Sequence, residues 1–399
     1  MPPSPILQSS KKKVGNKRMK VIINGRFLLP GGLVANHAAL LFEETVIGFS
    51  TETELPAETE VIDANGLYVS PGLVDMHIHG YLGEDASDGS AEGIRKIAEG
   101  LVKNGVTSFC PTTMTMDKRR LSDVFHMMRS LREESKAKGF PGAQILGVHA
   151  EGPFINPARK GAQNGAFIVP PDASWILEYA DILKVVTLAP EMENAMGFIE
   201  EISSKTDILL SAGHTDASYE AIVEAVLCGL SHITHTFNGM SPLTHREPGA
   251  AGAALTAPVT AELIADTFHI HPGLFALMAR AKGDKLVLIT DCNRAGGLPD
   301  GDYDLGGQTV HVHGIKCRLA DGTIAGSVLK LNHAVANMRA FTDLPLYEIV
   351  NMASLNPAVA LGEPKKGALT QGMDADIILC DEAFEVRRTI VRGETVYES

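Results

Sequence analysis

Cysteine, basic charge and long apolar runs are all scarce in this chain of 399 residues. The five cysteines are scattered without CxxC spacing, which argues against a disulfide framework and predicts reduced thiols in a cytoplasmic protein. No apolar run reaches the roughly 18 residues that a membrane span requires, so we expect no membrane insertion. With 35 basic against 48 acidic residues, the net charge of −13 argues against a nucleic-acid partner or an anionic membrane. A small anionic substrate stays compatible, because a few local cations can hold one.

The first 18 residues carry positive charge but lack the apolar segment of a signal peptide. We interpret residues 1–18 as a disordered leader upstream of a start at Met19, and we assign them no function.

The rest of the chain divides into three stretches with different patterns of expected secondary structure. Short strands and turns come first, at residues 20–23, 38–42, 45–49 and 60–63, with Asn24-Gly25 as a hairpin signal. From Pro71 a strand–loop–helix pattern repeats about eight times, with strands expected at residues 73–80, 106–110, 145–149, 183–188, 208–211, 232–236, 261–265 and 286–290. After a glycine-rich region at 296–326 and two helical segments, strand texture returns from Gly367.

This order predicts an α/β protein with a (β/α)8 TIM-like barrel and a small β-sandwich domain. We expect residues 71–365 to form the metal-dependent catalytic barrel. Residues 19–70 and 366–399, from both ends of the chain, are expected to build the sandwich together.

The first barrel strand carries the most informative motif, a His-x-His pair at its end. His77 and His79 are two residues apart, so a strand points both imidazoles to one face. Two imidazoles there are good ligands for one cation. The alternative is a pair of hydrogen-bonded core histidines, and this motif alone does not decide between the two.

Other strands of the expected barrel also end in groups that bind metals. The carboxyl ends of barrel strands converge on one mouth, where barrel enzymes keep their active sites. Imidazole and carboxylate ligands together suit Zn, Fe, Mn or Ni. A lone histidine or aspartate at a strand end is more often a packing or capping residue, but six such residues at one mouth indicate a divalent metal centre. These candidates are His77, His79, Glu151, His214, His235 and Asp291.

A second theme is a possible phosphate site after the sixth strand. The backbone N–H groups of Asn238 and Gly239, with the guanidinium of Arg246, are suited to hold a phosphate. The alternative is an ordinary turn and a surface ion pair, which the spacing alone favours slightly.

Several motifs together resemble the N-acetylglucosamine-6-phosphate deacetylases, a family within the amidohydrolase superfamily. The His-x-His pair marks only the superfamily, whereas three further segments are specific to the deacetylases. The matching pieces cover essentially Met19 to the C-terminus, and the specific ones are Glu151-Gly152-Pro153-Phe154, His235-Thr236-Phe237-Asn238 and His245-Arg246-Glu247-Pro248-Gly249.

The resemblance implies a role for each candidate residue. Glu151, His214 and His235 would hold the main metal, and His77 with His79 would hold a second metal that Glu151 bridges. Asp291 would touch the metal site and act as the catalytic base and acid. The substrate would be a phosphorylated amino sugar, bound by Gln163, Asn238, Gly239, Arg246 and His269, with Arg246 reaching in from the other subunit of a homodimer.

Two departures from the family pattern matter. Many members carry a histidine where this chain has Gln163, so the metals would polarise the acetamide carbonyl more fully here. The usual Asn-Ala-Met is Asn238-Gly239-Met240, which keeps the backbone donors. The rival interpretations are another barrel amidohydrolase, such as a cyclic amidase or deaminase, and a metal-free scaffold that has lost catalysis.

Overall fold

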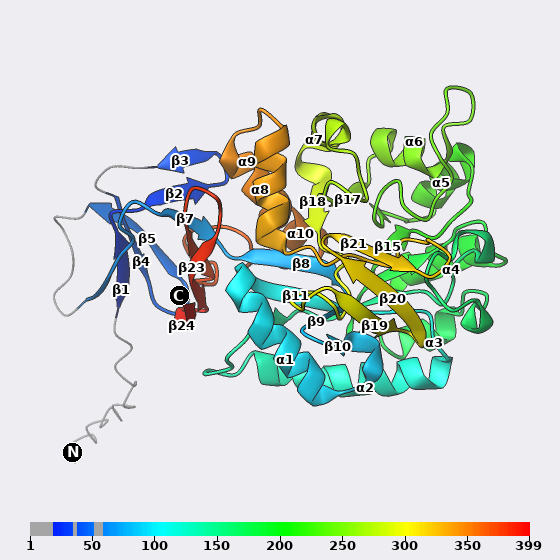
Figure 1. The fold of residues 1–399 in the computed structure, drawn as a ribbon, viewed down its shortest axis with the longest axis horizontal. Coiled ribbons are helices and arrows are strands. Elements are labelled where there is room, and N and C mark those ends of the chain that lie inside the picture. Colours follow the sequence, from blue (N-terminus) through cyan, green and yellow to red (C-terminus); the bar gives the residue numbers. More distant parts are fainter. Residues whose placement is uncertain (1–18, 35–37, 52–58) are drawn as a thin grey trace, which may run out of the picture.

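The structure, a computed structural model, describes residues 19–34, 38–51 and 59–399. The expected leader at 1–18 lies outside the described residues. Strands from both termini gather at one side of the molecule, and a larger α/β body lies beside them (Figure 1). Among the described residues, no helix combines the length and apolar character that crossing a bilayer requires.

The α/β body is a parallel barrel, as the strand–helix alternation predicts. Neighbouring strands pair in parallel around the barrel. A parallel bridge between Ile78 and Cys292 joins the last strand to the first and closes it. The eight strands are β8 (Leu73–Ile78), β11 (Val106–Thr113), β13 (Val148–Glu151), β14 (Leu183–Leu188), β15 (Leu209–Ala212), β16 (His232–Ile233), β17 (Thr260–Ile264) and β18 (Leu286–Ile289). The predicted (β/α)8 fold class is therefore confirmed.

Amphipathic helices cover the outside of the barrel. In α1 (Ala91–Leu101) the buried side chains Ile94, Ile97, Ala98 and Leu101 follow the helical period, and Ser90 caps its first turn by accepting from the Gly93 N–H. The other helices are α2 (Lys118–Ser135), α3 (Ala173–Leu177), α4 (Ala195–Lys205), α5 (Tyr219–Leu227), α6 (Gly249–Thr256), α7 (Phe275–Lys282), α8 (Leu331–Phe341), α9 (Leu346–Ala353) and α10 (Leu355–Ala360).

The terminal strands form two sheets that share one apolar core, as expected for a sandwich. Ile22, Leu40 and Phe42 from one sheet pack with Ile377 and Ile390 from the other. The first sheet has the order β5 (Val46–Thr51), β4 (Ala38–Phe42), β1 (Lys20–Ile23) and β6 (Glu60–Asp63). The second has the order β24 (Glu394–Glu398), β23 (Val386–Val391), β22 (Ile377–Cys380), β7 (Tyr68–Pro71), β2 (Arg26–Leu29) and β3 (Gly32–Val34). The exact domain boundaries stay a prediction.

The expected hairpin at Asn24-Gly25 is wrong. Strand β1 pairs with β4 and β6, whereas β2 pairs with β3 and β7 in the other sheet. Asn24 does take the left-handed turn conformation, with φ 54°. The turn therefore passes the chain from one sheet to the other, because the apolar faces of β1 and β2 meet across the core.

The glycine-rich region after β18 contains a small three-stranded sheet beside the barrel mouth. Its strands are β19 (Gly301–Leu305), β20 (Gln308–His313) and β21 (Lys316–Leu319). Leu305, Val310 and Cys317 pack there against Met114 and Ala295. The remaining short strands are β9 (Gly80–Tyr81), β10 (Glu84–Asp85) and β12 (Gln144–Ile145).

Candidate metal centre and active site

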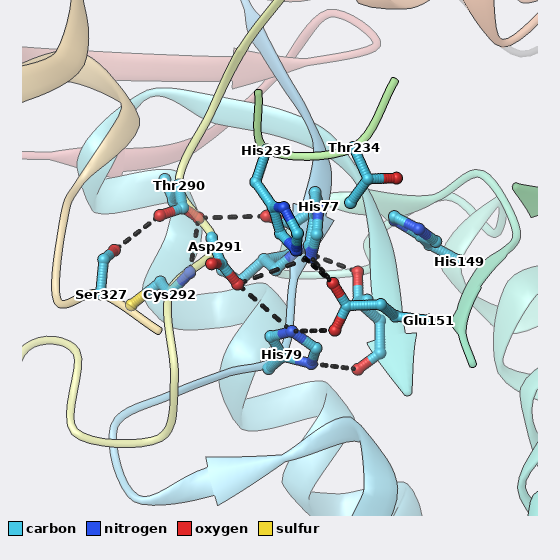
Figure 2. Close-up of polar contacts among 12 residues, drawn as sticks. His77, His79, His149, Glu151, Thr234, His235, Thr290, Asp291, Cys292 and Ser327 are labelled. Carbon is cyan, nitrogen blue, oxygen red and sulfur yellow. Dashed lines mark hydrogen bonds and ion pairs between the residues drawn. The ribbon is translucent and has the colours of Figure 1, made fainter. Parts of the chain in front are cut away.

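Six candidate side chains meet at the carboxyl ends of five barrel strands. All six residues are buried, and the most exposed of them keeps 7% of its surface. Figure 2 shows His79, His235 and Asp291 turned toward the Glu151 carboxylate. Two of the six residues lie within strands and four follow a strand: His77 in β8, His79 after it, Glu151 at the end of β13, His214 after β15, His235 after β16 and Asp291 after β18.

Three of these residues have a left-handed backbone conformation, which residues other than glycine rarely adopt. The φ angles are 48° at His214, 28° at His235 and 48° at Asp291. The left-handed backbone ends each strand abruptly, which is why β16 is shorter than the expected 232–236. Such strained residues persist where the surrounding structure over-determines them, and they cluster at functional sites.

The Glu151 carboxylate lies at the centre of the cluster. Its Oε1 is 3.0 Å from His235 Nε2, 3.3 Å from His214 Nε2 and 3.4 Å from His77 Nε2. Its Oε2 is 3.2 Å from His79 Nε2. Four imidazoles thus present the same nitrogen, Nε2, to one carboxylate.

Asp291 closes the other side of the cluster. Its Oδ1 is 3.2 Å from His79 Nε2 and 3.5 Å from His77 Nε2. Its backbone N–H donates to the His77 carbonyl at 2.9 Å, so the bond that closes the barrel also sets the position of this side chain.

Contacts behind the rings fix the orientation of most of the histidines. His79 Nδ1 contacts the Thr112 carbonyl at 3.2 Å, and His214 Nδ1 contacts the Arg159 carbonyl at 2.9 Å. A carbonyl oxygen accepts, so Nδ1 carries a hydrogen, and in the neutral ring Nε2 keeps its lone pair for a ligand. His235 Nδ1 is buried and has no hydrogen-bond partner among the described residues.

These donors fit a divalent cation. His77, His79 and Glu151 form one group of potential ligand atoms within 4.8 Å of one another, and Glu151, His214 and His235 form another. His77 Nε2 is buried without a hydrogen-bond partner among the described residues, although a buried polar nitrogen ordinarily has one. A cation bound between these groups would supply that partner, and imidazole plus carboxylate suits a transition metal.

The comparisons with known proteins agree with this geometry. The Amidohydrolase family model matches residues 68–396. The chain belongs to the amidohydrolase family. It is 40% identical over 358 residues to the N-acetylglucosamine-6-phosphate deacetylase of Bacillus subtilis (strain 168), with 88% of each chain covered.

Solved structures give the same result for the fold of this amidohydrolase. The N-acetylglucosamine-6-phosphate deacetylase from Pasteurella multocida has a TM-score of 0.90 at 28% identity, covering 96% of this chain and 100% of that one. A mutant of the Mycobacterium smegmatis enzyme, in complex with N-acetyl-D-glucosamine-6-phosphate, has a TM-score of 0.86 at 28% identity, covering 95% and 99%.

The carboxylates of this amidohydrolase centre are held in their ionised form. Burial alone would raise the pKa of Glu151, but the charges of His214 and His77 outweigh burial and lower it well below 4.5. Burial likewise opposes ionisation of Asp291, and the hydrogen bond from His79 with the charges of both neighbouring histidines lowers its pKa below 3.8. The centre therefore presents two negatively charged carboxylates.

A pocket of about 330 Å³ opens above the cluster. This volume suits a small polar substrate. Of the predicted site residues, His77 lies beneath the pocket floor with no exposed surface. The lining includes His79, Glu151, Gln163, His214, His235, Asn238, Gly239, His269 and Asp291.

Gln163, predicted to bind substrate, is fixed by two hydrogen bonds of its side-chain amide. Its Nε2 donates to Glu151 Oε2 at 2.5 Å, and its Oε1 accepts from the Thr115 N–H at 2.7 Å. The amide is thus directed at a carboxylate of the cluster. His269, also in the lining, is fixed by a 2.6 Å contact between its Nδ1 and Asp266 Oδ2.

Arg246 is the one predicted substrate-binding residue that does not line the pocket of its own chain. It is exposed, in the loop before α6, and does not line the cavity. Asn238 and Gly239 do line it, but no lysine or arginine among the described residues does. In a single chain, a phosphate in this pocket would therefore meet Asn238 and Gly239 but no lysine or arginine side chain.

Sequence reasoning missed two buried residues that contact or surround the cluster. Glu262 on β17 faces His77, and its signal was a lone charged residue within a buried strand segment, between Ala261 and Leu263. His149, in the motif before Glu151, is bound to the Thr187 hydroxyl at 2.7 Å and the Met76 carbonyl at 3.2 Å. Burial and the charge of His77 lower the His149 pKa to about 3, so that ring is neutral.

Proposed function

We propose that this amidohydrolase cleaves the acetamide of N-acetyl-D-glucosamine 6-phosphate to D-glucosamine 6-phosphate and acetate, a step of amino-sugar catabolism or cell-wall recycling. The observation that carries the proposal is the cluster of four histidines around Glu151, with Asp291 beside it. It lies in a chain 40% identical to an enzyme named for that reaction.

We propose one or two divalent ions per subunit, of Zn, Fe, Mn or Ni. Glu151, His214 and His235 would hold the main ion, and His77 with His79 a second ion that Glu151 bridges. Asp291 Oδ1 lies within reach of the second subsite. When bound, such an ion supplies a nucleophilic water at neutral pH and a Lewis acid for the carbonyl oxygen.

Asp291 is the proposed general base and acid. Its low pKa leaves the carboxylate ionised, so Oδ1 can accept a proton from the attacking water. The same oxygen then returns the proton to the nitrogen of the departing amine. Burial within the pocket keeps bulk water from competing for that proton.

The substrate is positioned by residues on three sides of the pocket. His269, held by Asp266, contacts the sugar, and Gln163 lies beside the acetamide while its amide orients Glu151. Asn238 and Gly239 offer their N–H groups to the 6-phosphate.

Arg246 supplies the missing cation from the second subunit of a homodimer. Support for this arrangement is the exposure of Arg246 together with a pocket that its own chain leaves without lysine or arginine. The five described cysteines are free thiols, and we place the enzyme in the cytoplasm. Because the net charge of the chain is negative, we expect neither a nucleic acid nor a membrane as a partner.

Acetate release from a panel of acetylated amino sugars tests the proposal. The panel holds N-acetylglucosamine, N-acetylgalactosamine and N-acetylmannosamine, each with and without the 6-phosphate, alongside elemental analysis of the protein. We expect acetate mainly from N-acetylglucosamine 6-phosphate. Ammonia release or cyclic-amide opening instead of deacetylation would favour another amidohydrolase activity. Protein without metal and without turnover would favour the inactive scaffold.

A further inference from the structure

Glu262 connects the proposed metal centre to the interior of the barrel. It lies on β17 with no exposed surface. Its Oε2 is 2.9 Å from His77 Nδ1 and accepts the His235 backbone N–H at 2.8 Å. Its Oε1 is 3.1 Å from His232 Nε2, and His232 Nδ1 is held at 2.5 Å by the Thr260 hydroxyl.

The contact with Glu262 determines which nitrogen of His77 carries the hydrogen. An ionised carboxylate only accepts, so the 2.9 Å contact requires the hydrogen on Nδ1. In the neutral ring the lone pair is then on Nε2, which faces Glu151 and Asp291 and has no hydrogen-bond partner among the described residues. In the opposite tautomer two lone pairs would meet at Nδ1, and Nε2 would present a hydrogen to the cation.

His77 differs in this respect from the other oriented histidines. Neutral backbone carbonyls orient His79 and His214, whereas an anionic side chain orients His77. Hydrogen bonds to a charged acceptor are roughly twice as strong as neutral ones, and they make the ring a more basic ligand. The charge of Glu262 thus acts directly on a ring of the His77–His79 subsite. Glu262 contacts the Glu151–His214–His235 subsite only through the His235 backbone N–H.

We propose that Glu262 is a positioning residue that locks His77 in the Nδ1–H tautomer and thereby sets the affinity of the His77–His79 subsite for its divalent ion. This inference rests on the metal centre of the proposed function, and it concerns metal occupancy rather than the substrate.

The alternative that Glu262 itself binds a cation has less support. His77, His149 and Glu262 do form a third group of potential ligand atoms. However, His77 Nδ1 and Glu262 Oε2 are in direct hydrogen-bond contact, which leaves no space for an ion between them. His149 is already engaged through both ring nitrogens.

The test is metal binding by the purified full chain, measured without substrate. Zn²⁺ is titrated into metal-free protein against a chelating indicator, and the bound metal is counted by elemental analysis. We expect two sites in the wild type. Glu262→Gln keeps the shape and one acceptor oxygen but loses the charge, and we expect its second site to weaken about 10- to 100-fold. Glu262→Met, without an acceptor, should bind one ion only, which also shows that it folds.

Asp75→Asn is the matched control. Asp75 is another fully buried carboxylate of the barrel, but it accepts the His77 backbone N–H at 3.3 Å and does not touch the ring. Its second site should stay within about threefold of the wild type, because replacement of a carboxyl group that does not contact Nδ1 leaves the tautomer unchanged. An equal loss in Asp75→Asn and Glu262→Gln would overturn the proposal.

A readout of the tautomer keeps the inference testable even if the variants are unstable. In ¹⁵N NMR of the Zn²⁺-loaded wild type with labelled histidine, we expect the His77 signals of a ring with hydrogen on Nδ1 and metal on Nε2. The proposal would be overturned if His77 carried its hydrogen on Nε2 alone or if the wild type bound only one ion. It would also be overturned if Glu262→Gln left the metal affinities unchanged or weakened both sites equally. Two intact sites with the expected Glu262 effects but no acetate release would contradict the proposed function and leave this inference standing.

Discussion

Replacement of Asp291 by asparagine is the most direct test of the proposed chemistry. The side chain is nearly isosteric, and only 7% of the residue is exposed, so the fold has no reason to change. What is lost is the oxygen that accepts a proton, Oδ1, which lies 3.2 Å from His79 Nε2. General acid–base groups contribute about 10²–10⁴ in rate. Because Asp291 acts in both steps, we expect kcat to fall by about 10³-fold or more, equivalent to about 4 kcal/mol in the barrier.

The assay is acetate release from N-acetylglucosamine 6-phosphate by Asp291→Asn with its metal content measured in the same sample. Asp304→Asn is the control, because Asp304 is exposed near the same mouth, where it accepts the Gly307 N–H at 3.3 Å and forms a 3.9 Å ion pair with Arg294. It should keep its rate within about twofold, in the range of ordinary surface substitutions. A metal-loaded Asp291→Asn variant within about tenfold of wild type would refute the assignment of the base.

The role of Asp291 as a base also predicts how the rate changes with pH. A general base works only when it is deprotonated, so the rate is lost as pH falls through its pKa. The pKa of Asp291 lies below 3.8, because the hydrogen bond from His79 and the neighbouring imidazole charges outweigh burial. We therefore expect the acidic limb due to Asp291 to lie below pH 3.8 and to be absent in Asp291→Asn.

Three further predictions follow from the phosphate site, the metal and a buried lysine. Arg246→Ala should raise KM about 10- to 100-fold for the phosphorylated sugar, since a charge-assisted bond is worth about 1.5–3 kcal/mol, and hardly at all for the unphosphorylated one; equal KM changes would contradict it. Chelation should abolish acetate release, and added Zn²⁺ or Mn²⁺ should restore it; full activity in metal-free protein would refute the metal centre. Burial lowers the pKa of Lys282 from 10.5 to about 8, so the folded state disfavours its charge. Lys282→Met should add about 1–2 kcal/mol to the free energy of unfolding at pH 7, and this gain should shrink as pH rises from 8 toward 10.5; a gain that does not change with pH in urea titrations would contradict the cause.

Much of the fold could be predicted because its signals are local. Strand β8 is bounded by Pro71-Gly72 and Gly80, and its apolar body is buried throughout. What failed depended on tertiary contacts. An amphipathic period gives no sign of α6, because its Gly249–Thr256 segment is built mostly of small residues. The Asn24-Gly25 turn has the right chemistry for a hairpin, but the choice of sheet depends on which faces pack together.

The site divides in the same way. Residues at strand ends, such as Glu151 and His214, could be grouped because barrel topology places all those ends at one mouth. The contacts that orient them could not be read from the chain. Glu262 lies in the interior of β17, and Gln163 lies in a loop, with its direction set by Thr115 and Glu151. Their roles depend on distances that only the fold determines.

The electrostatics of the cluster link its protons to its metal. Without a cation, the charges of Glu262 and Glu151 overcome burial and raise the His77 pKa to about 9. Asp291 and Glu151 likewise overcome burial and raise the pKa of His79 and His235. A divalent ion needs the Nε2 lone pairs that those protons occupy, and it supplies the positive charge that the buried carboxylates require. Proton and metal therefore compete for one set of atoms, so metal binding releases protons, and the affinity for metal falls as the solution becomes more acidic.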